Sequence, residues 1–468
     1  MDVLMVAAEL GPYERSTEAA DAIPALAKVL RQLGHRVTVA LPRYGSFEAH
    51  GLLVARRLTP LPVPGGEVTV YDGQLSSGVE LCLFDLPHLD LGLRDSRAEL
   101  DTRAVEHYLA LGRAAAALAR QRRDQQALDV IHAHDWSGGL IAAQLELPIP
   151  VVLTTYDARR AGFVEAGAAS ALDPGLRARF AVAGRYSALQ AALGGARAVV
   201  TPSTSYAAEL AEERASGPLA ASFAGLPEPV VGIASGIDYA VYNPAIDPAL
   251  DARYDAEDPY GKARTKGAML RQLRLDLDIS RPLAVFAAPL DREHGADVVL
   301  AALPELLRQN LSLIVAGEGD SELADAFRAA RGDRPESLAF VERPDDAQIR
   351  RLHAAADLAL VVEQRAPATT AQLVAQRYGV LPVALSAGAV RDTVVDCEPS
   401  LDTGTGFLFD RSSAEELVGA VERALSAYAE EEAWARLRRR VMRLDLGWDR
   451  AARRYAQVYR RAIELASG

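Results

Sequence analysis

Polar side chains with the potential for chemistry lie in two loops of the C-terminal half, each after a predicted buried strand. The first loop follows residues 283–288 and carries His294, and the second follows residues 357–362 and carries Thr369 and Thr370. In doubly wound α/β sheets, ligands bind at the loops that follow the carboxyl ends of the strands. A histidine can carry positive charge near neutral pH, although the neighbouring Glu293 disfavours a phosphate there. We therefore expect both loops to face a ligand-binding cleft.

A second set of candidate binding residues lies in the N-terminal half, again after predicted strands. The string HAHDWSGG at residues 132–139 places His134, Asp135 and Trp136 at the end of a short apolar strand. Tyr156 follows the next strand, and its hydroxyl is able to hydrogen-bond a sugar. These residues are candidates for substrate binding, although Trp136 also suits a core position and Tyr156 also suits an ordinary loop.

Two series of alternating strands and helices must position these residues. The first series begins with a strand at 3–8, an amphipathic helix at 17–33 and a strand at 35–41, which together form a βαβ unit. Residues 51–90 are rich in β-forming residues and predict hairpins beside that sheet. A second series starts near residue 283. The alternation predicts an α/β protein with parallel sheets covered by helices on both faces.

The length of the chain predicts two domains. At 468 residues it exceeds what one hydrophobic core usually serves. We expect the first domain at residues 1–245 and the second at 246–445, with the acidic, irregular stretch 247–262 as the linker. A long helical tract from 433 to 466 should close the chain.

Composition excludes several classes of partner. The net charge of −12 argues against a nucleic-acid surface and against an anionic membrane. No segment approaches the ~18 apolar residues of a membrane span, and the N-terminus has no basic region typical of a signal peptide. Cys82 and Cys397 are typical of buried thiols in a reducing compartment. We predict a soluble, cytoplasmic protein.

Several strings, in this order, carry a resemblance to one family: IHAHDWSGG, GIDYAVYNP, RYGVLPV and WDRAARRYAQVYRRA. Through them the chain resembles bacterial glycogen synthases and plant starch synthases along nearly its whole length. The resemblance implies a GT-B fold, in which two Rossmann-like domains face a cleft and a C-terminal helix, here 446–468, crosses back to the N-terminal domain. It also implies transfer of glucose from ADP-glucose to an α-glucan with retention of configuration, using no metal and no cofactor.

The family's Lys-Thr-Gly-Gly-Leu loop, which binds the sugar nucleotide, corresponds to residues 15–19. Arg15 keeps the positive charge, and Asp21 keeps the family's aspartate. Thr17 and Glu18 replace both glycines. A carboxylate about 4 Å from a phosphate repels it by roughly 4 kcal/mol at an effective dielectric near 20. The new residues also suit an ordinary helix start, with Ser16 or Thr17 as the cap and Glu18 in the first turn.

The chemical groups implied at other family positions are also replaced. Tyr156 stands in place of a histidine near the sugar. Pro289 and His294 stand where an arginine and a lysine neutralise the diphosphate leaving group. Ala366 replaces a glutamate, and Thr369 a glycine of the phosphate-binding backbone, with Thr370 beside it. Residues retained at family positions include His134, Asp135, Trp136, Gly236 and Asp238.

Two functional hypotheses follow. The first is a family member that has lost glucosyl transfer and binds an α-glucan, a nucleotide or an active enzyme of glycogen metabolism. It predicts millimolar or weaker binding of ADP-glucose, about −4 kcal/mol. The alternative is an active retaining glucosyltransferase, using ADP-glucose or another donor. In it, cationic residues near the cleft replace the lost cations: Arg15, His294, Arg159, Arg160 or Arg365. Because leaving-group stabilisation is usually a large catalytic term, we favour the first. A purely structural subunit would differ from it only in lacking ligand affinity.

Overall fold

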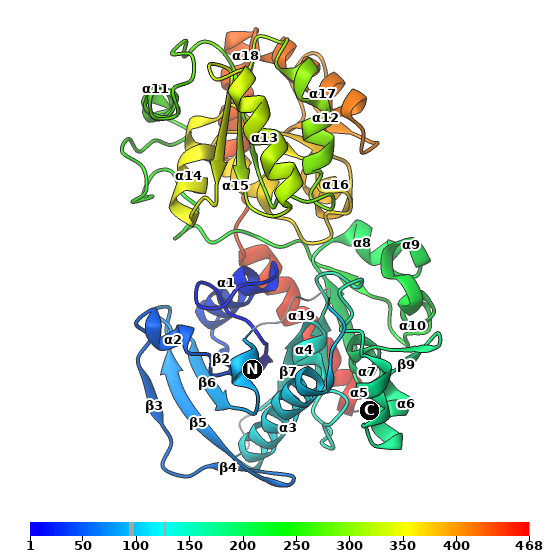
Figure 1. Cartoon of the computed structure of the whole chain (residues 1–468). Coiled ribbons are helices and arrows are strands. Elements are labelled where there is room, and N and C mark those ends of the chain that lie inside the picture. The colour runs from blue at the N-terminus through cyan, green and yellow to red at the C-terminus, as the bar shows by residue number, and fades with distance from the viewer. Residues whose placement is uncertain (93–97, 126–127, 468) are drawn as a thin grey trace. The chain divides into compact units, whose positions relative to one another are not determined.

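The computed structural model describes residues 1–92, 98–125 and 128–467, and its contacts divide them into two compact units (Figure 1). Unit 1 comprises Met1–Ser235 together with the C-terminal segment from Trp448, and unit 2 comprises Gly236–Gly447. Each unit has its own sheet and its own hydrophobic core.

Unit 1 contains a ten-stranded sheet whose larger part is parallel, as the βαβ pattern predicts. The central strand β1 is fully apolar after Asp2 and pairs with β2 on one side and β7 on the other. The parallel strands, in spatial order, are β12 (Val231–Gly232), β11 (Ala198–Thr201), β8 (Val151–Thr154), β7 (Val130–His134), β1 (Asp2–Val6), β2 (Arg36–Pro42) and β6 (Glu80–Asp85).

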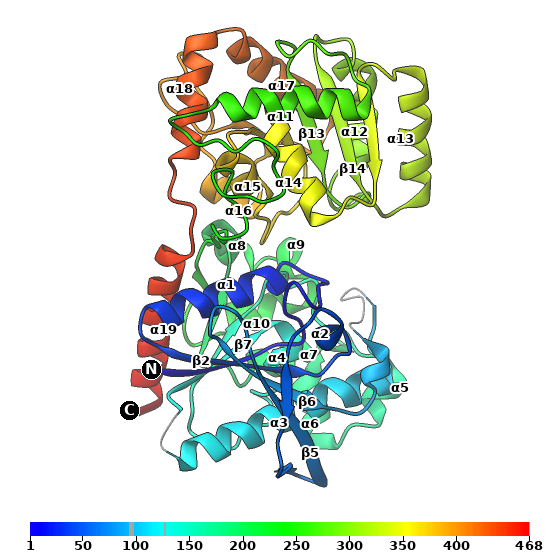
Figure 2. The same ribbon diagram turned by 90° about the vertical axis from the view of Figure 1, so that its left-hand side faces the viewer.

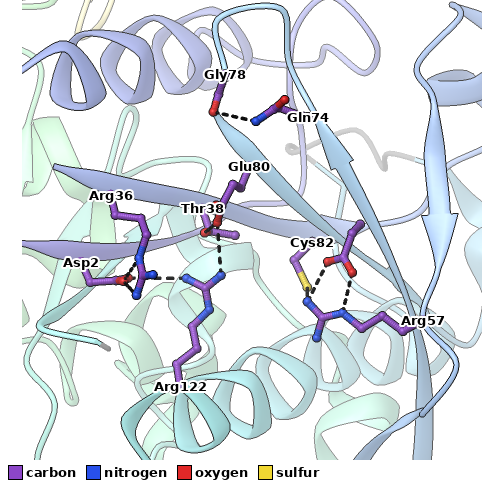
Figure 3. Close-up of polar contacts among 10 residues, drawn as sticks. Asp2, Arg36, Thr38, Arg57, Gln74, Gly78, Glu80, Cys82 and Arg122 are labelled. Carbon is purple, nitrogen blue, oxygen red and sulfur yellow. Dashed lines mark hydrogen bonds and ion pairs between the residues drawn. The ribbon is translucent and has the colours of Figure 1, made fainter. Parts of the chain in front are cut away.

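The β-rich stretch 51–90 extends this sheet instead of lying beside it. Its last strand, β6, pairs in parallel with β2. The remaining strands continue the sheet in antiparallel fashion and are β5 (Gly66–Gln74), β3 (Val54–Arg56) and β4 (Leu61–Val63). Figure 3 shows the polar contacts here: the Arg57 guanidinium binds the Asp72 carboxylate at 2.8 and 2.7 Å and lies 3.8 Å from Sγ of Cys82. The predicted hairpins are therefore present, and they join the sheet at its edge because the apolar strand β6 pairs with β2.

Helices cover both faces of the unit 1 sheet. The longest, α3, begins at the cap Asp101, whose carboxylate accepts from the backbone N–H of Ala104, and ends in Arg122 and Arg123. Basic residues in the last turn offset the partial negative charge of the helix end. The helices are α1 (Ala19–Gln32), α2 (Ser46–Ala49), α3 (Thr102–Asp124), α4 (Asp135–Gly139), α5 (Ala166–Ser170), α6 (Pro174–Phe180), α7 (Ala188–Leu193), α8 (Thr204–Glu209), α9 (Glu213–Ser216), α10 (Ala220–Ala224) and α19 (Asp449–Ser467).

The C-terminal helix α19 belongs to unit 1, where it lies beside α1 in both views (Figures 1 and 2). The buried hydroxyl of Tyr459 lies 2.7 Å from Nδ1 of His132. The expected single tract 433–466 is two helices, since α18 (Glu431–Met442) ends before the chain reaches α19. The helix is interrupted because the backbone near Gly447 pairs with Ile237, where the chain leaves unit 1.

Unit 2 is a six-stranded parallel sheet between helices, as the second βα series predicts. Its strands, in spatial order, are β15 (Leu338–Glu342), β14 (Ser312–Gly317), β13 (Leu283–Ala287), β16 (Leu358–Val361), β17 (Leu381–Leu385) and β18 (Phe407–Phe409). Its helices are α11 (Tyr260–Leu273), α12 (Ala296–Leu306), α13 (Ser321–Asp333), α14 (Asp346–Ala355), α15 (Ala371–Arg377), α16 (Gly388–Thr393), α17 (Ala414–Tyr428) and α18.

The acidic stretch after Asp247 packs on unit 2, although its composition is typical of a linker. The Asp247 side chain is fully buried, pairs with Arg350 at 3.0 Å and accepts a hydrogen bond from the Tyr378 hydroxyl. A buried carboxylate is tolerated only with such partners. Composition alone does not show these partners, because they lie 103 and 131 residues away.

Within residues 1–92, 98–125 and 128–467, no helix is long and apolar enough to cross a membrane. Cys82 and Cys397 are free and buried, and burial raises their pKa values to about 12 and about 11. Neither thiol is therefore a nucleophile near neutral pH.

Candidate functional site

A small hollow lies at the carboxyl ends of β1, β7 and β8 in unit 1. Its volume is about 30 Å³, which is room for roughly two water molecules. The residues that line it are Ala8, Glu9, Ser16, Thr17, Glu18, Tyr108, Asp135, Trp136, Ser137, Tyr156, Asp157 and Arg160. Four of them carry carboxyl groups, and Arg160 adds a guanidinium.

Glu9 organises the loop between β1 and α1. Its buried carboxylate accepts from the backbone N–H groups of Ser16 at 2.6 Å and Thr17 at 3.0 Å, and from the Thr17 hydroxyl. Burial raises the pKa of Glu9, while these three hydrogen bonds lower it. The Glu9 carboxylate thus fixes the conformation of the loop in which Thr17 and Glu18 replace the two glycines.

The start of α1 differs from the expected cap. The N-cap position is Glu18, whose side chain makes no capping hydrogen bond, whereas the Thr17 hydroxyl accepts from Ala19 N–H at 3.2 Å. The helix begins two residues later than expected because Glu9 holds Ser16 and Thr17 in the loop. The Glu18 carboxylate has no hydrogen-bond or ion-pair partner among the described residues, which leaves it available to a ligand.

The candidate substrate residues Arg15 and Asp21 bind each other. Their ion pair measures 2.9 Å, and a side chain at Gly11 would lie 2.8 Å from the Asp21 carboxylate. The positive charge of Arg15, which the resemblance places on a nucleotide diphosphate, is therefore balanced by Asp21 in the first turn of α1. Glycine at position 11 leaves the room that this pair needs.

Asp135 is held in a left-handed backbone conformation, with φ of 51°. Its carboxylate accepts from the backbone N–H of Tyr156 at 2.9 Å. Loss of solvent raises the pKa of Asp135 to about 8, and the nearby carboxylates of Glu9, Glu18 and Asp157 contribute to this rise. A non-glycine residue in this conformation is uncommon, and such strain gathers at functional sites.

His134 and Tyr156 point toward each other in the interior. Nδ1 of His134 lies 3.2 Å from the Tyr156 hydroxyl, and both side chains are almost fully buried. Burial lowers the pKa of His134 to about 3, so its ring is neutral. Both groups are shielded from solvent, and the Tyr156 hydroxyl has its hydrogen-bond partner, His134, within unit 1.

Trp136 is a core residue that also forms one wall of the hollow. Its indole is 5% exposed and packs edge-on against Tyr108 with ring centroids 4.7 Å apart. Gly162 lies so close that a Cβ there would be 2.5 Å from the indole. Replacing Trp136 would therefore disturb packing as well as the hollow.

The two arginines that follow Tyr156 have local partners. Nη2 of Arg159 donates to the carbonyl of Arg214, and Nε of Arg160 lies 3.7 Å from the Asp157 carboxylate. Asp157 also accepts from the backbone N–H of Arg159 at 2.9 Å. These contacts stabilise the loop after β8.

In unit 2, the loop after β13 carries the two replaced family positions. Pro289 is exposed, and Nδ1 of His294 lies 2.7 Å from the Asp291 carboxylate, which also accepts from the His294 backbone N–H. The His294 side chain therefore points toward Asp291 of the same loop. Arg292, between them, is exposed and has no hydrogen-bond or ion-pair partner within the described residues.

An ion pair joins this loop to the loop after β16. Nη2 of Arg365 lies 2.6 Å from the Glu293 carboxylate, and the Gln364 backbone N–H donates to the Glu293 carbonyl at 2.9 Å. The loop positions expected to face a ligand are therefore brought together at the carboxyl edge of the unit 2 sheet. The Glu293 carboxylate balances the positive charge of Arg365 there.

Ala366 lies in the interior of the loop after β16. It is fully buried in a left-handed conformation with φ of 44°, and its carbonyl accepts from Ala389 N–H at 2.8 Å. Thr369 and Thr370 precede α15, with Thr370 at its N-cap position, and the carbonyl of Thr369 accepts from the Gln372 amide at 3.1 Å. A glutamate at 366 would need space that the present backbone does not provide.

Gly236 and Asp238 lie where the chain enters unit 2. The Asp238 carboxylate accepts from the backbone N–H of Ala240 at 2.9 Å, and neighbouring Ile237 donates to the Leu446 carbonyl at 2.8 Å. Both residues therefore belong to the turn at which the chain enters unit 2.

Sequence reasoning missed Glu9 and Asp157 as members of the unit 1 hollow. Both follow the carboxyl end of a predicted strand by a few residues, which is the one signal that marks them. Both side chains accept hydrogen bonds from backbone N–H groups. Such contacts cannot be predicted from residue types, because almost every residue has a backbone N–H group.

Comparisons with known proteins agree along the chain. Residues 2–224 match the model of the starch synthase catalytic domain, and residues 274–440 match that of glycosyl transferases group 1. A glycogen synthase of Anaeromyxobacter sp. (strain Fw109-5) is 32% identical over 98% of this chain and 99% of its own length. A glycogen synthase of Thermus thermophilus is 33% identical over 99% and 100%. The catalytic domain of starch synthase IV from Arabidopsis thaliana, bound to ADP and acarbose, superposes with a TM-score of 0.87 at 24% identity, covering 99% of both chains.

Proposed function

The chain belongs to the glycogen and starch synthase family of GT-B glycosyltransferases, and on this premise we propose that it binds an α-glucan but has lost glucosyl transfer. The observation that carries the proposal is that His294 and Arg365, two of the groups that could approach a diphosphate in the unit 2 loops, have partners within the chain. His294 is held by Asp291 and Arg365 by Glu293, so neither is free to neutralise a leaving diphosphate.

The unit 1 hollow supports the glucan part of the proposal. Carboxylates repel a phosphate but accept hydrogen bonds from sugar hydroxyls, and Glu18 and Asp157 line the hollow with such groups. The Glu18 carboxylate has spare acceptor capacity, because no described residue donates to it. The hollow itself is too small for a hexose, so an α-glucan would lie across its rim, beside Glu18 and Asp157.

The first experiment is an assay of donor hydrolysis and chain elongation with ADP-glucose and UDP-glucose. The Thermus thermophilus glycogen synthase serves as the active reference. We expect no elongation above background and an ADP-glucose dissociation constant in the millimolar range or weaker, about −4 kcal/mol. Elongation at a rate near that of the reference would overturn the loss of transfer.

The second experiment tests glucan binding by calorimetry with maltooligosaccharides. Glu18→Ala should weaken binding about tenfold, and Glu18→Gln, which keeps an acceptor oxygen, should weaken it less. Glu67→Ala is the matched control, because Glu67 is an exposed acid of β5 that does not line the hollow. Equal affinities for the parent and Glu18→Ala would exclude this rim as the glucan site.

One observation favours the alternative of an active transferase. Arg292 is exposed in the loop after β13 and lacks a partner among the described residues, so it is a cation available to a diphosphate. If elongation is found, Arg292→Ala should abolish it. Binding to an active enzyme of glycogen metabolism and a cytoplasmic location stay predictions.

A further inference from the structure

A second hollow in unit 2 lies away from the loops that follow β13 and β16. Its volume is about 450 Å³, within the usual range of small-molecule sites. It lies where α11 and α14 pack side by side (Figure 1), and residues 250–252 and Ile279 complete its walls. Three arginines line it: Arg264 and Arg271 of α11, and Arg351 of α14.

These three guanidinium groups have no hydrogen bond or ion pair with any described residue. The neighbouring Arg350 provides a contrast, because it turns to the buried Asp247 at 3.0 Å. An arginine presents five donors in a planar fork, which suits the oxygens of a phosphate. Three guanidinium groups with open hydrogen-bond donors therefore surround one concave surface, an arrangement that suits an anion.

Small residues create the space between the arginines. Positions 264, 267 and 271 share one helical face, and Gly267 lies between the two α11 arginines. A Cβ at Gly267 would be 3.7 Å from Nη1 of Arg271 and 3.8 Å from Cγ2 of Ile279. The Arg271 side chain thus lies back along the helix over Gly267, in the direction of Arg264.

The other lining residues suit the body of a ligand. Leu250 and Met269 are buried and form an apolar floor, and Ile279 is 54% exposed at the edge. Asp251 and Gln272 supply acceptor oxygens for hydroxyl groups. The charged side chains that line the hollow are three arginines and one aspartate, in a chain whose net charge is −12.

We propose that this hollow binds a small phosphorylated sugar, with the phosphate among Arg264, Arg271 and Arg351 and the hydroxyl groups facing Asp251 and Gln272. The concave shape favours a small molecule over an extended polyanion. The proposal goes beyond glucan binding and does not depend on whether glucosyl transfer is lost.

Calorimetry on the full chain tests the site with four probes: a hexose 6-phosphate, the free hexose, inorganic phosphate and inorganic sulfate. We expect the hexose phosphate to bind tightest and inorganic phosphate more weakly, and the free hexose to show no measurable binding. Arg351→Ala and Arg264→Ala should each weaken hexose phosphate binding about tenfold, as expected for hydrogen bonds to charged groups. Arg351→Lys, which keeps the charge but loses the fork, should lose part of the affinity.

Arg331→Ala is the matched control, because Arg331 lies on α13, is exposed, and lines no part of this hollow. It should bind as the parent does. Circular dichroism of each variant verifies folding, and Arg264 is exposed, so its loss leaves the core intact.

Three results would overturn the proposal. One is absence of binding by hexose phosphate at millimolar concentration. Another is equal binding by the parent, Arg264→Ala and Arg351→Ala. A third is sulfate binding as tightly as the hexose phosphate, which would show a general anion site with no role for Asp251 or Gln272.

Discussion

Asp135→Asn should remove a pH-dependent penalty on the stability of unit 1. In the folded chain burial raises the pKa of this carboxyl to about 8, whereas in the unfolded chain it lies near 4. Between these values the folded state binds the additional proton, so stability is full at low pH and falls as pH rises toward 8. Asparagine tolerates the left-handed backbone and still accepts from Tyr156 N–H, but it has no charge to bury.

The expected magnitude follows from the two pKa values. Each pKa unit corresponds to about 1.4 kcal/mol, so the full effect above pH 8 is at most about 6 kcal/mol. At pH 5 the gain from Asp135→Asn should be about 1 kcal/mol, and at pH 8.5 about 3–5 kcal/mol. Local rearrangement that admits water would bring the larger figure down.

Chemical denaturation at pH 5 and pH 8.5 measures this difference. The chain has three tryptophans, and a Trp434→Phe background leaves Trp136 and Trp448, both in unit 1, as fluorescent reporters. Asp124→Asn, at the exposed end of α3, makes the same change of charge and should show little dependence on pH. An Asp135→Asn gain that is equal at both pH values would refute the reasoning.

Two further predictions concern buried groups. Ala366→Gly should raise the free energy of unfolding of unit 2 by about 0.5–1 kcal/mol, because φ is 44°. Ala366→Glu should lower the free energy of unfolding by about 2 kcal/mol or more and should not restore elongation. Chemical denaturation tests the stability of both variants, and glucose incorporation tests elongation. Elongation by Ala366→Glu would contradict the prediction. Tyr459→Phe leaves Nδ1 of buried His132 unsatisfied and should cost about 1–3 kcal/mol by denaturation. Tyr455→Phe should cost less, because Thr154 keeps its contact with His132, and equal losses would contradict this.

The sequence predicted the elements whose burial is periodic. The apolar face of α1 is an example, since Ile23, Leu26 and Leu30 are all buried as the 3.6-residue spacing requires. The parallel series of unit 2 was predictable for the same reason. The resemblance to glycogen and starch synthases identified the fold, which the structural comparison confirms.

The contacts of the candidate site were not predictable in the same way. Arg15 and Asp21 could be named as candidates, but their mutual ion pair depends on how the loop turns at Gly11. Glu9 binds two backbone N–H groups, and residue types do not encode that geometry. Arg365 and Glu293 are 72 residues apart, and only the parallel order of β13 and β16 brings their loops together.

The place of α19 in unit 1 has a consequence for synthesis of the protein. Tyr459 and Tyr455 contact His132 and Thr154, which precede them by 327 and 301 residues. A ribosome must therefore make all of unit 2 before the face of unit 1 against α19 is covered. Unit 2 is continuous in sequence and has all its strands once Gly447 has emerged. Although unit 1 begins first, it is completed last, and until then it is the part of the nascent chain that most needs protection from aggregation.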